Sequence, residues 1–291
     1  LNNSLIKSTF NGKQKNQIKM LNPLSLEINS MRQNLFYGLL NNISYNLNRK
    51  QENIKIFEFG KVYVKKTSKK NNLNNYKESN LLSIMACGLK ENLSWSNLKN
   101  NQIDFFWLKN TTDQILDRCN ITEIKYKEIK DDFFEYGIEY SNNTTKTKNH
   151  IAKIGKIKKD VLNNFRIKKD VFCAELNWEI LVENIKNNKK IIFTPNSKYP
   201  EVKRDLSILT NNNIKFQEIK NCILDINTKL IKNVDLFDIF EGNESTNNRK
   251  SYSISIILED KRKTLIENDI QNIIDEIILK LKNKLNIEIR M

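Results

Sequence analysis

Short basic runs in the last hundred residues are the side chains whose types and spacing favour a chemical role. They lie beside the ends of predicted strands, at the rims of one predicted domain. Cations in such positions contact phosphate oxygens, and the forked donors of Arg bind planar groups in a way that a point charge cannot. We therefore expect contacts to the phosphates of an RNA from Lys198, Lys203, Arg204, Arg249, Lys250, Lys261, Arg262, Lys263 and Arg290.

The net charge of the chain is a weaker signal than its size indicates. It is formally +15, but Lys supplies 41 of the 49 basic residues and Arg only 8. Lys and Asn are abundant, while Gly and Pro number 7 and 3, and a genome biased toward A and T produces this composition without selection on charge. The few Arg residues are therefore more informative than the Lys residues.

The cysteines and the single histidine argue against a metal site. Cys87, Cys119, Cys173 and Cys222 are far apart and form no C-x-x-C pair, so we expect no metal and buried, reduced thiols of a cytoplasmic protein. His150 lies in a polar stretch and is expected to be solvated. No apolar run approaches the roughly 18 residues of a membrane helix, so no membrane contact is expected.

The elements that must position the basic runs follow from hydrophobic periodicity. From Lys198 onward the pattern changes from strand to helix to strand, strand, helix and strand, which is the order of a ferredoxin-like unit. Its strands are expected at 204–210, 233–241, 251–259 and 285–289, and its helices at 216–230 and 270–281. In this fold both helices cover one sheet face and leave the other for a partner. Tyr199, Phe237, Phe240 and Tyr252 are candidates for base stacking or for core packing.

The preceding part of the chain predicts a domain of the α+β class, rich in antiparallel strands. An amphipathic helix runs through Met31 and Leu47, with Asn29 or Ser30 as its cap. Residues 65–80 are basic and Asn-rich, which predicts a solvated loop. Further strands are expected at 53–64, 81–89, 123–130, 133–140, 151–157 and 171–177, and further helices at 103–120 and 175–185.

A linker that contains Pro195 and Pro200 separates the two parts. We therefore expect domains at 1–194 and 195–291. The chain opens on Leu1 and not on Met, so we also expect it to be a piece of a longer protein.

Strings in both halves resemble one family. LNPLSLEINSMRQNLFYGLLNNISYNLNR, KIFEFGKVY and DFFWLKNTTDQIL are similar to the class II synthetase-like core of the bacterial phenylalanine–tRNA ligase beta subunit. SKYPEVKRDLSIL, VDLFDIFEG, KSYSISIILED and KRKTLIENDI resemble its C-terminal ferredoxin-like anticodon-binding domain. The resemblance covers the chain from about residue 20, and the ordered set is far more specific than any single string.

The resemblance implies a heterotetramer of two alpha and two beta subunits that attaches phenylalanine to tRNA-Phe with ATP and Mg²⁺. The alpha subunit would bind ATP and Mg²⁺, this segment would bind neither, and editing would belong to upstream domains. The nine basic residues would then lie near the anticodon stem and loop.

The core itself is expected to be catalytically empty. Class II chemistry needs Arg on the phosphates of ATP, whereas the turn after the strand at 53–64 offers Lys65 and Lys66 and no Arg-x-Glu. Glu58 is either a pocket residue or a strand-edge carboxylate. Two alternative functions are a complete single-chain ligase of organellar type and a stand-alone RNA-binding module.

Two local features of the second domain are also open to test. Ile266 stands where the family usually has Thr or Ser as a helix cap, and Ile cannot accept the free N–H bonds of the first turn. Arg204 either contacts RNA or forms an ion pair with Asp205.

Overall fold

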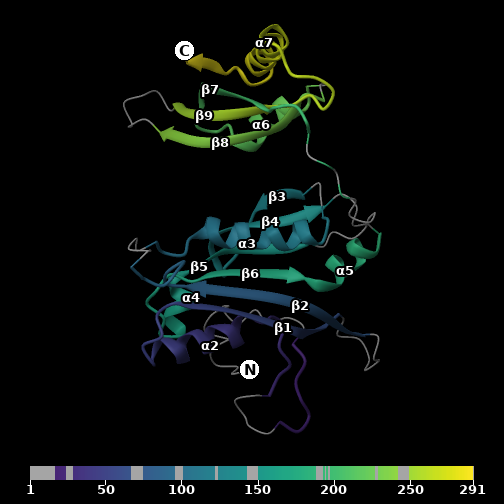
Figure 1. The fold of residues 1–291 in the computed structure, drawn as a ribbon. Helices are drawn as coiled ribbons and strands as arrows, with labels where there is room; N and C mark the ends of the chain where they lie inside the picture. Colours follow the sequence, from purple (N-terminus) through teal and green to yellow (C-terminus); the bar gives the residue numbers. More distant parts are fainter. Residues whose placement is uncertain are drawn as a thin grey trace. The chain divides into compact units, whose positions relative to one another are not determined.

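The computed structural model describes residues 17–23, 29–66, 75–95, 101–121, 124–142, 150–187, 193, 195, 197–226, 229–241 and 249–290 (Figure 1). The chain divides into two compact units, Leu1–Ile191 and Ile192–Met291, and each has a hydrophobic core of its own. They are called unit 1 and unit 2 below.

Unit 1 is built on a six-stranded antiparallel sheet in the order β1-β2-β6-β5-β4-β3. Its strands are β1 (Ile54–Lys65), β2 (Tyr76–Cys87), β3 (Ile124–Glu128), β4 (Phe134–Asn142), β5 (Ala152–Ile157) and β6 (Phe172–Asn177). Strand β6 shows how the sheet is buried on both faces. Cys173 packs with one core cluster, whereas Phe172 and Ala174 pack with the other.

Helices cover both faces of this sheet. Helices α2 (Phe36–Leu47) and α4 (Lys159–Asn164) supply the core cluster that contains Cys173. Helices α3 (Phe105–Arg118) and α5 (Trp178–Asn187) supply the cluster that contains Ala174. Asp104 caps α3 by accepting a hydrogen bond from the Trp107 N–H at 2.7 Å. The α+β class and the antiparallel sheet expected from the sequence are confirmed.

Helix α2 begins at Phe36, several residues after the predicted cap at Asn29 or Ser30. Ser30 instead pairs with Lys19 in a β-bridge, and the Met31 N–H donates to the Ile18 carbonyl at 2.9 Å. The Arg32 carbonyl accepts from the Tyr63 N–H at 2.8 Å. These backbone bonds hold the segment extended, although its side chains follow helical spacing.

One other local prediction for unit 1 is wrong, and one helix was not predicted. Residues 76–80 were expected in a loop but open β2, where Tyr76 pairs with Lys65 and Glu78 forms an ion pair with Lys61. Helix α4 was not expected, because it is only six residues long and has no side-chain cap. The rest of the predicted loop, 67–74, lies outside the described residues.

Unit 2 is a four-stranded antiparallel sheet in the order β10-β7-β9-β8. Its elements are β7 (Val202–Asn211), α6 (Phe216–Leu224), β8 (Ile231–Glu241), β9 (Arg249–Leu258), α7 (Glu267–Leu285) and β10 (Glu288–Arg290). Both helices pack with Ile208, Val234 and Ile254 in one core, so they share one sheet face. The predicted ferredoxin-like topology is confirmed.

Helix α6 ends at Leu224, earlier than the sequence predicted. The Asp225 N–H closes the helix on the Asn221 carbonyl, and the Leu230 carbonyl accepts from the Glu259 N–H at 2.8 Å. Leu230 is therefore held by the end of the β9 segment and not by a longer helix. Helix α7 starts after Ile266, whose side chain makes no cap bond, as its type predicts.

Candidate nucleic-acid interface

Eight of the nine basic residues predicted to contact RNA lie at two opposite ends of the unit 2 sheet, and Arg290 pairs with Ser207 in the middle of β7. Strand β7 pairs with β9 from Val202 opposite Leu258 to Asn211 opposite Arg249, which spans about 30 Å. At the first end the sequence order places Lys198, Lys203, Arg204, Lys261, Arg262 and Lys263. Arg249 and Lys250 open β9 at the second end, so the nine residues do not form a single cluster.

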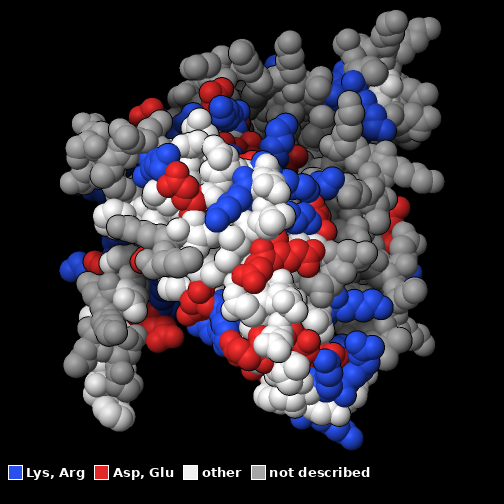
Figure 2. All heavy atoms as spheres, turned by 90° about the horizontal axis from the view of Figure 1, so that it is seen from above, with Lys and Arg blue, Asp and Glu red and all other residues white. Residues whose placement is uncertain are grey.

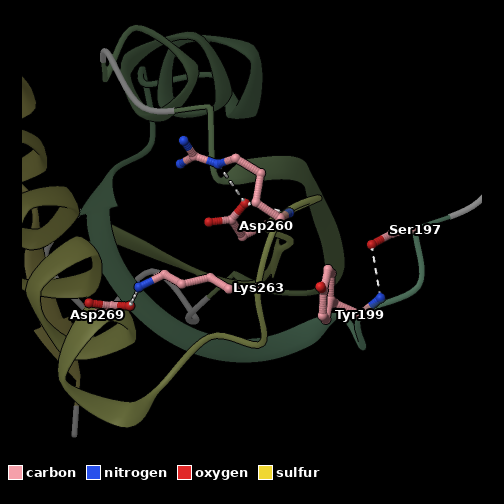
Figure 3. A network of polar contacts seen from close by, with 6 residues as sticks. Ser197, Tyr199, Asp260, Lys263 and Asp269 are labelled. Carbon is pink, nitrogen blue, oxygen red and sulfur yellow. Dashed lines mark hydrogen bonds and ion pairs between the residues drawn. The ribbon is translucent and has the colours of Figure 1, made fainter.

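Two cations of the first end hold α7 in place. Arg204 donates two hydrogen bonds from Nη2 to the Glu267 carboxylate, at 2.9 and 2.8 Å. The Lys263 Nζ lies 2.7 Å from Asp269 Oδ2 (Figure 3). Both carboxylates stand in the first turn of α7, where the helix dipole favours negative charge. The partner of Arg204 is thus Glu267, and the alternative pair with Asp205 is not formed.

The cations of the second end are also engaged. Arg249 Nη1 forms an ion pair with Glu288 Oε2 at 2.9 Å, which links β9 to β10. Lys250 is buried and donates to the Asn212 carbonyl at 2.7 Å. Arg290 ends β10 opposite Ser207, and its side chain lies outside the described residues.

Lys198 and Lys203 differ in their surroundings. The Lys203 Nζ lies 3.7 Å from Asp205 Oδ1 and 5.7 Å from the centre of the Phe237 ring. Lys198 is exposed and has no ion pair with any described residue. Next to it the Tyr199 N–H donates to Ser197 Oγ at 3.1 Å, which fixes the approach to β7 (Figure 3).

An open pocket of about 580 Å³ lies at the first end of the sheet. It is lined by Lys229, Leu230, Lys232, Glu259, Asp260, Lys261 and Arg262. Its lining holds four cations against two carboxylates, so the pocket has a positive excess. We call this set of residues the cationic pocket.

Asp260 fixes the turn that carries two of these cations (Figure 3). Its Oδ1 accepts from the Arg262 N–H at 2.9 Å and lies 3.4 Å from Arg262 Nε. The hydrogen bond from the Arg262 backbone holds the pKa of Asp260 below its usual value, so the carboxylate stays ionised. The Arg262 side chain is 87% exposed, so its terminal nitrogens face solvent.

The sequence prediction missed Lys229 and Lys232. Lys229 precedes β8 and Lys232 is the second residue of that strand. Both are about thirty residues from Lys261 in the sequence, and neither belongs to a basic run. Lys232 pairs with Glu201 and lies 3.1 Å from Glu259 Oε2. The pairing of Ile231 with Leu258 brings the two lysines beside residues 259–262, and this pairing cannot be predicted from the sequence.

The helix-free sheet face of unit 2 is not basic. On the face shared with Ser253 and Ser255, strand pairing places Lys203, Arg249 and Arg290 but also Asp205, Asp235, Asp238 and Glu288. On the face drawn in Figure 2, which is seen from above Figure 1, Lys and Arg are also interspersed with Asp and Glu. Such a mixture gives phosphate groups no continuous attractive surface.

The candidate aromatic residues separate into two classes. Tyr252 is 4% exposed, packs in the core and donates from its hydroxyl to the Ile214 carbonyl, so it is not available for stacking. Phe237 and Phe240 are 58% and 64% exposed on the edge strand β8. Tyr199 is 36% exposed beside the start of β7.

In unit 1, Glu58 takes part in a structural contact. Glu58 on β1 pairs with Arg32, whose Nε also donates to the Lys61 carbonyl at 2.8 Å. Glu58 thus lies on an edge strand, as the second of the two readings expects, and its carboxylate is held by Arg32. His150 was predicted to be solvated, but it is half-buried, and burial lowers its pKa.

All four cysteines are free thiols, as the sequence predicted, and Cys119 is the half-buried member of the set. Among the described residues, no three His, Cys, Asp or Glu side chains gather where they could hold a metal ion. No helix within the described ranges has the length and apolar character to cross a membrane.

Comparisons with known proteins decide the family. The family described as "Phenylalanyl tRNA synthetase beta chain CLM domain" matches residues 2–178. The chain belongs to the phenylalanyl-tRNA synthetase beta chain family. The family described as "Ferredoxin-fold anticodon binding domain" matches residues 197–290, which make up nearly all of unit 2. The resemblance drawn from the sequence strings is therefore confirmed.

Curated relatives carry the same family name. The phenylalanine–tRNA ligase beta subunit of Bacteroides thetaiotaomicron is 35% identical over 300 residues, covering all of this chain and 36% of the relative. The beta subunit of Fusobacterium nucleatum is 33% identical over 276 residues, covering 94% of this chain and 33% of the relative. The chain thus spans about a third of the length of these beta chains.

Proposed function

We propose that this chain is the non-catalytic, C-terminal part of a phenylalanine–tRNA ligase beta subunit. In this proposal unit 2 holds the anticodon region of tRNA-Phe, while unit 1 docks on an alpha subunit in a cytoplasmic heterotetramer of two alpha and two beta chains. The alpha subunit binds ATP and Mg²⁺ and activates phenylalanine. The observation that carries the proposal is a solvent-facing group of cations in a domain of the anticodon-binding family.

The distribution of charge supports RNA contact at the first end of the unit 2 sheet. Lys261 has no carboxylate partner among the described residues, and the terminal nitrogens of Arg262 face solvent. Arg204, Arg249 and Lys263 each pair with a carboxylate and contribute to the fold of unit 2. Of the nine predicted residues, we therefore assign direct phosphate contact to Lys198, Lys261 and Arg262.

The polar contacts beside β1 do not favour a site for ATP with Mg²⁺. Activation requires a fixed guanidinium on the phosphates, whereas Arg32 is bound by Glu58 and the Lys61 carbonyl. The turn after β1 offers Lys65 and Lys66 instead of an Arg. These contacts support a scaffold role for unit 1 and do not favour the single-chain ligase.

An exposed aromatic row on β1 supports docking on a second protein. Phe57 and Phe59 are 74% and 50% exposed, and β1 is an edge strand of twelve residues. The Phe59 ring meets Trp178 of α5 edge to face, with centroids 4.7 Å apart. Exposed aromatic rows on sheet edges mark protein contacts, which disfavours a stand-alone RNA-binding module.

The test is phenylalanine-dependent exchange of pyrophosphate into ATP. We expect no exchange by this chain alone, and exchange once an alpha subunit is bound. Phe57→Ser should weaken co-purification with the alpha subunit, whereas Leu279→Ser on α7, 62% exposed before substitution, should not. Exchange by the isolated chain would overturn the non-catalytic assignment.

A further inference from the structure

The cationic pocket contains cations of two kinds. Lys232 is held between Glu201 and Glu259, so it forms part of the pocket wall. Lys229 and Lys261 are exposed, and among the described residues neither has a carboxylate partner. Arg262 uses its Nε and backbone N–H on Asp260, which leaves Nη1 and Nη2 for a ligand.

The turn that carries Arg262 is fixed before any ligand arrives. Asp260 is 5% exposed and bonds to both the backbone and the side chain of Arg262. A guanidinium whose Nε is held in this way presents its remaining pair of donors as a fork, the geometry that binds two oxygens of one phosphate. Less side-chain entropy is then lost on binding.

The shape of the pocket favours an unpaired nucleotide over a duplex. A concave space of about 580 Å³ is in the range that small organic ligands occupy. The half-buried Leu230 supplies an apolar part of its lining. Nucleotides of single-stranded RNA can leave the stack and enter such a space, whereas those of a helix must first be unpaired and unstacked.

We propose that the cationic pocket takes one nucleotide of a single-stranded RNA segment, with its phosphate bound by Arg262, Lys229 and Lys261, and that Asp260 is a positioning residue for Arg262. This inference rests on the proposed function, because it names the place where unit 2 contacts an RNA loop. It adds Lys229 and Asp260 to the interface.

The test is binding of a tRNA-Phe transcript by the full chain at several salt concentrations. Each phosphate contact removed should lower the slope of log affinity against log salt by about 0.7, the value for single strands. We expect this decrease for Lys229→Ala, Lys261→Ala and Arg262→Ala. Lys263→Ala is the matched control, because the Lys263 ammonium group forms an ion pair with Asp269. The salt slope of this variant should stay unchanged.

The outcomes separate this inference from the proposed function. If the unaltered chain does not bind the transcript, the proposed function of unit 2 fails. If the chain binds it and none of the three variants changes the slope, the pocket assignment is overturned while RNA binding stands. Inorganic phosphate is the second probe. Arg262-dependent binding of phosphate, with unchanged RNA slopes, would make the pocket a free-anion site and overturn the assignment to RNA.

A double-variant cycle tests the role of Asp260. Asp260→Asn should weaken RNA binding in the unaltered chain, because the fork of Arg262 is released. In the Arg262→Ala background the same change should strengthen binding, because it removes a negative charge near phosphate. A merely structural role would give the same sign in both backgrounds, and that result would overturn the positioning role.

Discussion

The carboxyl group of Glu175 shows how burial alters one residue of unit 1. It lies on β6 between Ser83 of β2 and Lys153 of β5. Burial raises its pKa from 4.5 to about 7, although Lys153 and the Leu35 N–H act in the opposite direction. Its Oε2 atom is buried and has no hydrogen-bond partner among the described residues. The ionised form is therefore unfavourable in the folded chain.

This shift makes the stability of unit 1 depend on pH. Because the folded chain binds this proton more tightly than the unfolded chain, the free energy of unfolding falls as pH rises from about 4.5 to about 7. The contribution is fully present below the unfolded pKa and is lost above the folded pKa. A shift of this size corresponds to about 3 kcal/mol at most.

Glu175→Gln should remove this pH dependence. We expect it to raise the free energy of unfolding at pH 8 by up to about 3 kcal/mol and to change it little at pH 4.5. Urea denaturation at the two pH values measures the difference. Glu183→Gln, at an exposed position of α5, is the control and should have no such effect. An equal effect of Glu175→Gln at both pH values would contradict the account.

Charge pairing was the part of the site that the sequence could not predict. The sequence showed which residues are basic and that they lie beside predicted strand ends. It also indicated that the Arg residues are more informative than the Lys residues. The partners of these cations were not visible, because Arg204 and Glu267 are 63 residues apart and Arg249 and Glu288 are 39 apart. Tertiary contacts decide which cations remain available to bind phosphate. They also decide that Lys229 lies in the cationic pocket.

At the scale of elements, periodicity predicted most of the fold. The alternation in β9 and the apolar stripe of α7, with Ile270, Ile273, Ile274 and Ile277 buried, were both readable. The predictions failed where backbone pairing overrides side-chain pattern. The Arg32 carbonyl is bonded to the Tyr63 N–H, so helical spacing around Met31 does not produce a helix.

The start of α7 is an element that lacks its usual cap. Ile266 has extended backbone angles and no oxygen to accept the N–H groups of the first turn, and its side chain is 57% exposed. Replacing it therefore costs little packing, while a hydroxyl at this position satisfies a free donor.

Ile266→Thr should raise the free energy of unfolding by about 1 kcal/mol, the typical value of a cap. Thermal or urea denaturation of the chain measures the change. Ile266→Val is the matched control, since Val has the same branching at Cβ and no oxygen. Equal stability of the Thr and Val variants would show that the hydroxyl does not cap the helix.

At the scale of the whole molecule, the two units divide the work that we propose. Unit 1 buries its sheet between two helical layers and leaves an aromatic row on β1, which suits contact with another protein. Unit 2 combines a ferredoxin-like sheet, whose helix-free face carries mixed charge, with a cationic pocket at one end. RNA contact should therefore be confined to that end of unit 2.

Photo-crosslinking of a tRNA-Phe transcript to the chain, followed by mapping of the linked peptides, tests this claim most directly. We expect crosslinks in peptides that contain Lys229, Leu230 and residues 259–263, and their loss in Arg262→Ala. Crosslinks concentrated on the helix-free face around Asp235 and Phe240, or on unit 1, would contradict it.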